Sequence, residues 1–285
     1  MRSYRAAVIQ MNSSNRLNDN LRAAERLIAQ AKNEGAKLVV LPENFAVFNA
    51  GQMFEVGTGE SSESPVIRTF LSEQARNHNL FLVGGTIPVA VKIDRQEEGN
   101  ESQRVRAASF LYDDKGAEIA RYDKLHLFDA QIADGHGSYC ESDTFEPGDT
   151  PVTVDTPLGT IGMSVCYDLR FPELYRILFN AGAQLITVPS AFTAATGEAH
   201  WEPLLRARAI ENLSYVLASN QGGSHGPKRK TWGHSMIIDP WGKVLAEAGS
   251  EPAVITAEID LDRLAKYRAD LPVIEHQRFF HKETI

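Results

Sequence analysis

The stretch that decides the fold reads GTIGMSVCYDLRFPEL and spans residues 159–174. Its small and apolar first half is typical of a buried strand, and the helical pattern after it places Cys166 at a sharp bend between strand and helix. A thiol held there is near backbone N–H groups and the positive end of a helix dipole, as a nucleophile requires. On position alone a packed core cysteine is the better interpretation, and two motifs upstream reverse that preference.

Apolar runs alternate with helical patterns on both sides of this stretch, which indicates an α/β fold with a mixed sheet. More than eight strands favour two stacked sheets between helices. We expect one domain spanning residues 1–285, and a long loop at 125–151. The predicted strands are 6–10, 38–41, 80–87, 104–112, 118–122, 185–188, 214–219, 235–239, 244–248 and 253–259. The predicted helices are 21–31, 66–75, 172–181 and 201–212.

Composition narrows the class of protein. A net charge of −8 without a basic cluster argues against nucleic acid and anionic membranes as partners. No apolar run is long enough to span a bilayer. The two cysteines and the absence of a signal-peptide pattern predict a reducing, cytoplasmic location. No Cys-x-x-Cys or His-Glu-x-x-His pattern occurs, so a zinc site has little support.

Two further residues have the chemistry to serve Cys166. Glu43 follows the predicted strand 38–41, and α/β folds place their chemistry at strand ends, where a carboxylate can act as a general base. Lys124 follows the predicted hairpin with apolar neighbours, so its ammonium needs a partner. A carboxylate can take the thiol proton, and an adjacent cation favours the thiolate. Taken singly, Glu43 also fits an exposed strand-end acid and Lys124 a solvated surface lysine.

Several segments, taken in their order along the chain, resemble those of the nitrilase, or carbon–nitrogen hydrolase, superfamily, and the resemblance covers nearly the whole chain. The matching segments are 41–43, 124–127, 145–149, 166–173, 189–192 and 233–240. The resemblance implies a four-layer αββα sandwich with two mixed β-sheets that forms a homodimer or higher homo-oligomer. It also implies that Glu43, Lys124 and Cys166 are catalytic, with Glu141 as a further acid that orients Lys124 or the substrate.

The chemistry implied by the resemblance is amide hydrolysis through a thioester on Cys166, without a cofactor. Glu43 would accept the thiol proton. The Lys124 ammonium and the backbone N–H of Tyr167 would bind the oxyanion, and such fixed donors each contribute about 3 kcal/mol.

A finer resemblance, in segments 137–142 and 196–212, is to the deaminated glutathione amidase branch. Those enzymes release 2-oxoglutarate and cysteinylglycine, so the expected partner is a small amide with a carboxylate. Arg170 is a candidate to bind that carboxylate, and a structural ion pair with Asp168 or Glu173 is an equal alternative. Cys140 has no assigned role. The further candidates for the pocket wall are His126, Phe192 and Thr193.

Other functions stay open on the sequence. Within the family these are an ω-amidase and an N-carbamoyl amino acid amidohydrolase, with nitrile hydration less supported. A papain-type Cys–His hydrolase is a rival, although Cys166 lacks that family's local sequence. A ligand-binding scaffold of the same fold is the non-enzymatic alternative.

Overall fold

The computed structural model describes residues 3–91, 104–132, 137–226 and 229–279. Its first sheet has seven strands and mixes parallel with antiparallel pairs. The order across that sheet is β17 (Ala253–Asp260), β1 (Ser3–Gln10), β2 (Ala36–Val40), β3 (Phe81–Val83), β5 (Val105–Tyr112) and β4 (Ile87–Ala90), with β6 (Glu118–Asp123) also paired to β5.

The second sheet has six strands and is also mixed. Its order is β16 (Val244–Glu247), β15 (Met236–Ile238), β12 (Tyr215–Asn220), β11 (Leu185–Ser190), β10 (Gly159–Met163) and β9 (Val152–Thr156). Two small hairpins lie outside the sheets: β7 (Asp129–Ile132) with β8 (Gly137–Cys140), and β13 (Gly222–Ser224) with β14 (Lys230–Trp232).

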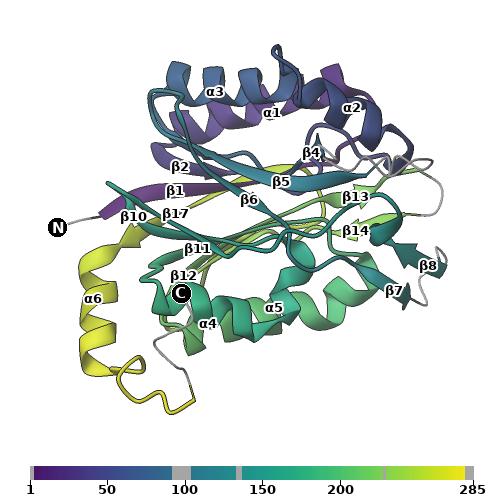
Figure 1. Ribbon diagram of the computed structural model, residues 1–285. Coiled ribbons are helices and arrows are strands. Elements are labelled where there is room, and N and C mark those ends of the chain that lie inside the picture. The colour runs from purple at the N-terminus through teal and green to yellow at the C-terminus, as the bar shows by residue number, and fades with distance from the viewer. Residues whose placement is uncertain (1–2, 92–103, 133–136, 227–228, 280–285) are drawn as a thin grey trace.

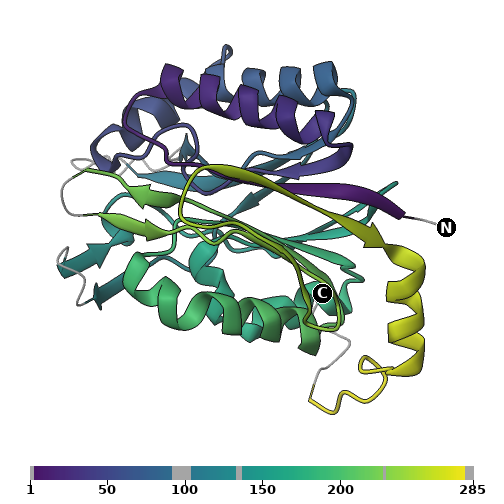
Figure 2. The ribbon, with the colours of Figure 1, turned by 180° about the vertical axis from the view of Figure 1, so that it is seen from behind.

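The two sheets stack face to face and helices cover both outer faces, so the chain forms the expected four-layer αββα sandwich (Figure 1). The first sheet is covered by α1 (Leu17–Asn33), α2 (Met53–Glu60) and α3 (Val66–His78), the second by α4 (Pro172–Asn180) and α5 (Ala194–Glu211). Seen from behind, α6 (Leu261–Asp270) continues from β17 and stands at the edge of the sandwich (Figure 2). Three short 3-10 helices are η1 (Ala50–Gln52), η2 (Glu141–Asp143) and η3 (Cys166–Arg170).

Strand β2 shows why an unbroken apolar run correctly predicted a strand that is buried on both faces. Leu38 and Val40 belong to the apolar cluster between the two sheets, whereas Val39 and Leu41 belong to the cluster under the helices. Because the side chains of a strand alternate between faces, a strand with both faces covered is apolar at every position. This burial fixes the point at which the chain emerges toward Glu43.

The predicted strand 80–87 is wrong in one respect, since the chain leaves the sheet between β3 and β4. Gly85 has φ +58°, and a Cβ on it would lie 2.0 Å from the carbonyl oxygen of Pro42. Only glycine fits so close to the neighbouring backbone in this conformation. The break therefore allows the segment that leads into Glu43 to pack against the end of β3.

The predicted loop 125–151 is also more ordered than expected, because it contains β7, β8 and η2. The sequence analysis likewise missed several elements, most of them short or lacking clear periodicity. These are α2, α6, β9, β13 and β14.

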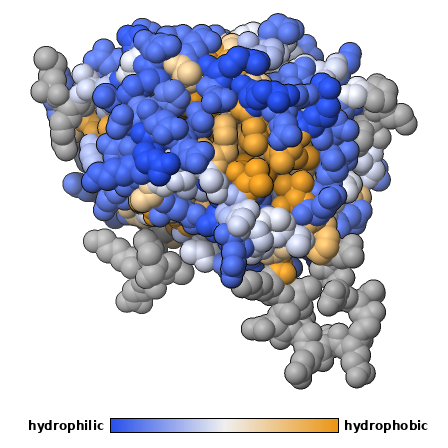
Figure 3. All heavy atoms as spheres, turned by 90° about the horizontal axis from the view of Figure 1, so that it is seen from above, coloured by the Kyte–Doolittle hydropathy of each residue, from blue (hydrophilic) through white to orange (hydrophobic). Residues whose placement is uncertain are grey.

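The outer face over α1, α2 and α3 is largely hydrophilic, with one apolar area near its centre (Figure 3). None of the described helices combines the length and the apolar character needed to cross a bilayer.

Candidate active site

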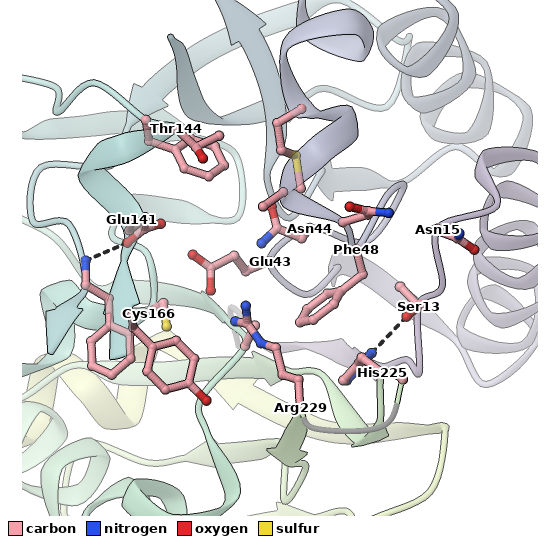
Figure 4. Close-up of a pocket in the computed structure, with 18 of the residues that line it drawn as sticks. Ser13, Asn15, Glu43, Asn44, Phe48, Glu141, Thr144, Cys166, His225 and Arg229 are labelled. Carbon is pink, nitrogen blue, oxygen red and sulfur yellow. Dashed lines mark hydrogen bonds between the residues drawn. The ribbon is translucent and has the colours of Figure 1, made fainter. Parts of the chain in front are cut away.

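A cavity of about 870 Å³ opens where several strands end and the two small hairpins project. Glu43, Lys124, Glu141 and Cys166, which come from four distant segments, all line it. Figure 4 shows Glu43, Glu141 and Cys166 facing the same space. The structure therefore brings together the four residues that the sequence analysis named as catalytic.

The turn after β2 holds Glu43 in place. Asn44 has a left-handed backbone with φ 55°, and its N–H donates to Thr86 Oγ1 at 2.9 Å. The carbonyl oxygen of Glu43 accepts from Gln221 Nε2 at 3.0 Å, which ties the turn to the end of β12. These two hydrogen bonds fix the backbone on the C-terminal side of Glu43. Its side chain is buried, with only 3% of the residue surface exposed.

Lys124 is fixed by its backbone immediately after β6. Its N–H donates to Ala107 O at 3.0 Å, and its carbonyl accepts from Gly148 N–H at 2.8 Å. The side chain is buried, and Nζ lies 2.8 Å from Glu43 Oε1 and 2.8 Å from Glu141 Oε1. One ammonium thus bridges two carboxylates.

The ammonium of Lys124 and the two carboxylates around it stabilise each other's charged forms. Burial alone would lower the pKa of Lys124, but the negative charges of Glu141 and Glu43 raise it well above its ordinary value. Burial raises the pKa of Glu141, and the ammonium opposes that shift. Glu141 Oε2 also accepts from the N–H of Phe128 at 2.6 Å. Lys124 therefore stays an ammonium, with Glu141 as its second carboxylate partner.

Cys166 occupies the expected bend, but η3 rather than α4 begins there. Its φ of 47° is in the left-handed region, which is strained for a residue with a side chain. The first bond of η3 runs from Asp168 N–H to Val165 O at 3.0 Å. The N–H groups of Cys166 and Tyr167 precede that bond and have no partner within the turn. The bend thus presents a sulfur atom beside unused backbone donors.

The Lys124 ammonium favours the thiolate, as expected, but other contributions outweigh it in the free protein. Burial and the charge of Glu43 raise the pKa of Cys166 well above its ordinary value. Lys124 and a hydrogen bond from the Ala191 backbone oppose this shift but do not reverse it. Because the sulfur is held as a thiol at neutral pH, it needs a base at the moment of attack.

Asp168 joins the cysteine turn to the segment that carries Lys124. It is fully buried. Its two carboxylate oxygens accept four hydrogen bonds, from Tyr122 Oη (2.6 Å), Val165 N (2.8 Å), His126 N (3.0 Å) and His126 Nδ1 (2.7 Å). The relative position of nucleophile and ammonium therefore depends on this carboxylate.

The Asp168→Asn variant is expected to lose about 3 kcal/mol of unfolding free energy, because an amide turns a donor toward groups that themselves donate. Urea unfolding measures this loss, and Asp114→Asn, on an exposed turn residue, is the control. An Asp168 variant as stable as the wild type would show that the network does not hold the turn.

Within the described residues, no group of three or more His, Cys, Asp or Glu side chains is arranged to hold a metal ion.

Comparison with known proteins shows to which family the chain belongs. The model of the family described as carbon-nitrogen hydrolase matches residues 5–269. The chain belongs to the carbon–nitrogen hydrolase family. This carbon–nitrogen hydrolase is 43% identical over 282 residues to a deaminated glutathione amidase of Synechocystis, covering 98% of this chain and 100% of that one. A deaminated glutathione amidase of Yersinia enterocolitica is 40% identical, covering 98% and 94%. The human omega-amidase NIT2 is 38% identical, covering 98% and 96%.

Solved structures agree with this assignment. The Caenorhabditis elegans NitFhit protein has a TM-score of 0.85 and 39% identity, over 97% of this chain and 65% of that longer chain. Saccharomyces cerevisiae Nit3, a member of the nitrilase superfamily, has a TM-score of 0.83 and 33% identity, over 97% of both chains. A Nesterenkonia amidase has a TM-score of 0.75 and 28% identity, over 94% of this chain and 98% of that one, and in one of its mutants acrylamide had added to the active site cysteine.

The carbon–nitrogen hydrolase does not place Arg170 in the cavity wall. Arg170 Nη1 lies 3.2 Å from His200 Nδ1, and its guanidinium packs over the rings of Tyr167 and Phe192. This contact with His200 replaces the ion pair with Asp168 or Glu173 that was the alternative to substrate binding. The proposed carboxylate contact by Arg170 has no support from this position.

Three other predicted wall residues are also absent from the cavity lining. The ring of His126 stacks on Phe171 at 3.7 Å and contacts Asp168. Phe192 packs on Trp201, and Thr193 caps the N-terminus of α5. Their positions support the residues that carry the site, and none of the three is among the side chains that line the cavity.

Sequence reasoning missed the wall formed by Phe48, His225 and Arg229. The ring of Phe48 stacks on His225 with centroids 3.9 Å apart, and Arg229 packs over Phe48 at 4.6 Å. All three are in loops without periodicity. A histidine and an arginine near the turn of a small hairpin were the only available signal.

His225 is neutral in the folded protein. Its Nδ1 lies 2.8 Å from the carbonyl oxygen of Ser13, a contact drawn in Figure 4, and Nε2 lies 2.7 Å from Thr231 Oγ1. The carbonyl can only accept, so Nδ1 carries the proton and Nε2 accepts from the hydroxyl. Burial, together with the charge of Arg229, lowers the pKa of His225 to about 4.

This shift predicts a pH dependence of stability. The folded protein binds the His225 proton less tightly than the unfolded chain, whose value is about 6.5. Its contribution to stability is therefore present above pH 6.5 and is lost as the pH falls toward 4. Chemical unfolding at several pH values is expected to show a shallower loss over this window in His225→Asn than in the wild type. Parallel curves would contradict the assignment.

Proposed function

We propose that this carbon–nitrogen hydrolase cleaves the amide bond of deaminated glutathione through a thioester on Cys166, releasing 2-oxoglutarate and cysteinylglycine. The observation that carries the proposal is the Lys124 ammonium, which bridges Glu43 and Glu141 at 2.8 Å in the same cavity as Cys166. A base, a fixed cation and a thiol are the parts that acyl transfer to sulfur needs.

In the first half of the reaction, Cys166 attacks the amide carbonyl while its proton passes to Glu43. The proton must leave during the attack, because the raised pKa keeps Cys166 a thiol until a base takes its proton. The oxyanion forms beside the Lys124 ammonium and the N–H of Tyr167. Glu43 returns the proton to the amide nitrogen, the C–N bond breaks, and the amine leaves.

In the second half, water replaces the amine. Glu43, again a carboxylate, takes a proton from water as the water oxygen attacks the thioester carbonyl. The same two donors hold the second oxyanion. The C–S bond breaks, the sulfur regains a proton from Glu43, and the acid product leaves. Glu141 takes part in neither proton transfer and acts as a positioning residue for Lys124.

Size supports a substituted amide as the substrate. Pockets for drug-sized ligands occupy roughly 300–1,000 Å³, and the cavity of about 870 Å³ is near the upper end of that range. The two bacterial relatives at 40% and 43% identity are named deaminated glutathione amidases. The human relative named omega-amidase keeps 2-oxoglutaramate, a smaller primary amide, as the second candidate.

The deciding experiment compares kcat/KM for deaminated glutathione with kcat/KM for 2-oxoglutaramate on the same preparation, following amine release. We expect the first substrate to be preferred. Preference for the second would assign the ω-amidase reaction instead. No amine release from primary amides, N-substituted amides, N-carbamoyl acids or nitriles would favour a ligand-binding scaffold.

The cellular location, the oligomeric state and the single-domain organisation also stay proposals. The chemistry needs a reduced Cys166, which supports a cytoplasmic location. Sedimentation equilibrium tests the proposed homodimer, and limited proteolysis tests whether residues 1–285 form one domain.

A further inference from the structure

Among the described residues that line the cavity, Arg229 is a cation to which the proposed reaction gives no role. Arg229 precedes β14 and lines the cavity. Its Cζ lies 4.6 Å from the ring centroid of Phe48 and 5.5 Å from that of Tyr139. These rings come from the segment after β2 and from β8, so the guanidinium is held by two separate elements. Figure 4 shows Arg229 reaching into the space between Phe48 and Cys166.

The charges around Arg229 show that it is not part of the Lys124 cluster. Lys124 is engaged by Glu43 and Glu141. In the described part of the chain, no carboxylate lies within ion-pair distance of the Arg229 guanidinium, and its Nε is buried without a hydrogen-bond partner. A buried N–H of a charged group is costly to leave without an acceptor, and an anion bound to the guanidinium would supply one.

The neighbouring groups restrict which ligand fits. His225 is neutral, because burial and the charge of Arg229 lower its pKa to about 4. Among the described residues of this wall, Arg229 therefore carries the positive charge. The planar guanidinium binds a carboxylate through two parallel hydrogen bonds, which a lysine cannot do.

We propose that Arg229 binds the carboxylate of the substrate and so sets the preference of this site for anionic amides. The inference rests on the proposed function, since it assigns a group of that substrate. Arg170, the carboxylate ligand expected from the sequence, contacts His200 and lies outside the cavity lining. Arg229 takes its place.

The test compares each acid with its methyl ester. Deaminated glutathione and its glycine ester probe one carboxylate, and 2-oxoglutaramate and its ester probe the other. The acid-to-ester ratio of kcat/KM is expected to fall about 10–100-fold in Arg229→Gln for at least one pair, mainly through KM, as for a lost hydrogen bond to a charged group. Arg229→Lys is expected to recover part of it. The pair that responds identifies which carboxylate binds.

Two controls separate charge recognition from general damage. Arg26→Gln, on an exposed residue of α1, and Arg170→Gln are expected to keep the wild-type ratio. An unchanged ratio in Arg229→Gln, or a collapse only in Arg170→Gln, would overturn the inference.

Binding of 2-oxoglutarate, measured by calorimetry, needs no turnover and keeps the two claims apart. Where the 2-oxoglutaramate pair responds, we expect wild-type protein to bind 2-oxoglutarate at least about 10-fold more tightly than Arg229→Gln does, and where only the glycine pair responds, the same difference is expected for cysteinylglycine. If wild type turned over no amide but this difference held, the proposed function would fail alone. If wild type hydrolysed the amide but neither ratio nor binding changed in Arg229→Gln, this inference would fail alone.

Discussion

The Cys166→Ala variant is expected to lose amide hydrolysis by about 10⁴-fold or more, because the loss of a catalytic nucleophile removes nearly the whole rate enhancement. Cys166 is the thiol at the strained bend, where the N–H groups of Tyr167 and of its own backbone have no partner within the turn. Steady-state kinetics with deaminated glutathione measure the loss.

The matched variant is Cys166→Ser, which keeps the shape and a weaker nucleophile. Both variants are expected to unfold at temperatures close to that of the wild type, which separates lost chemistry from lost structure. Retention of more than about 1% of the activity in Cys166→Ala would exclude a thioester at this position.

The Lys124→Met variant is expected to lose both activity and stability. Activity falls by about 10²–10³-fold, because the oxyanion loses a fixed donor. Unfolding free energy falls by about 3–5 kcal/mol, because Glu43 and Glu141 are left facing each other in a buried site without their shared cation. Denaturant unfolding and steady-state kinetics measure the two losses independently.

The stability loss of Lys124→Met has a predicted pH dependence. Burial raises the pKa of Glu141, and without the ammonium that opposes this shift the pKa lies further above its value in the unfolded chain. The folded variant then binds a proton more tightly than the unfolded chain, so its stability is greatest at low pH and falls as the pH rises. The deficit relative to wild type is expected to shrink toward pH 4. Lys115→Met, on an exposed turn residue, is the control. A deficit that does not change with pH would contradict the buried cluster.

The parts of the site that the sequence predicted are those fixed by strand ends. Lys124 directly follows β6, and Glu43 comes shortly after the end of β2. Burial of β2 determines where Glu43 emerges, and the pairing of β6 with β5 places Lys124. The pairing of Lys124 with Glu141 was accessible only through family resemblance. Its acid lies on η2, in a stretch that reads as loop because β8 has only four residues.

The parts that the sequence did not predict depend on contacts between distant segments. Arg229 has a local sequence that fits any polar turn, and it becomes a cavity residue only because Phe48 and Tyr139 lie beneath it. Arg170 shows the reverse. It is four residues from Cys166 in the chain, yet η3 turns it toward His200. Proximity in sequence was therefore a poor guide to the direction of a side chain on a short 3-10 turn.

The covalent intermediate is the most direct test of the account. Wild-type protein is mixed with deaminated glutathione, quenched in acid within milliseconds, and analysed by intact mass and peptide mapping. The account predicts a hydroxylamine-sensitive 2-oxoglutaryl adduct on the peptide that contains Cys166, and none in Cys166→Ala. Full turnover without an adduct, or an adduct on Cys140, would contradict it.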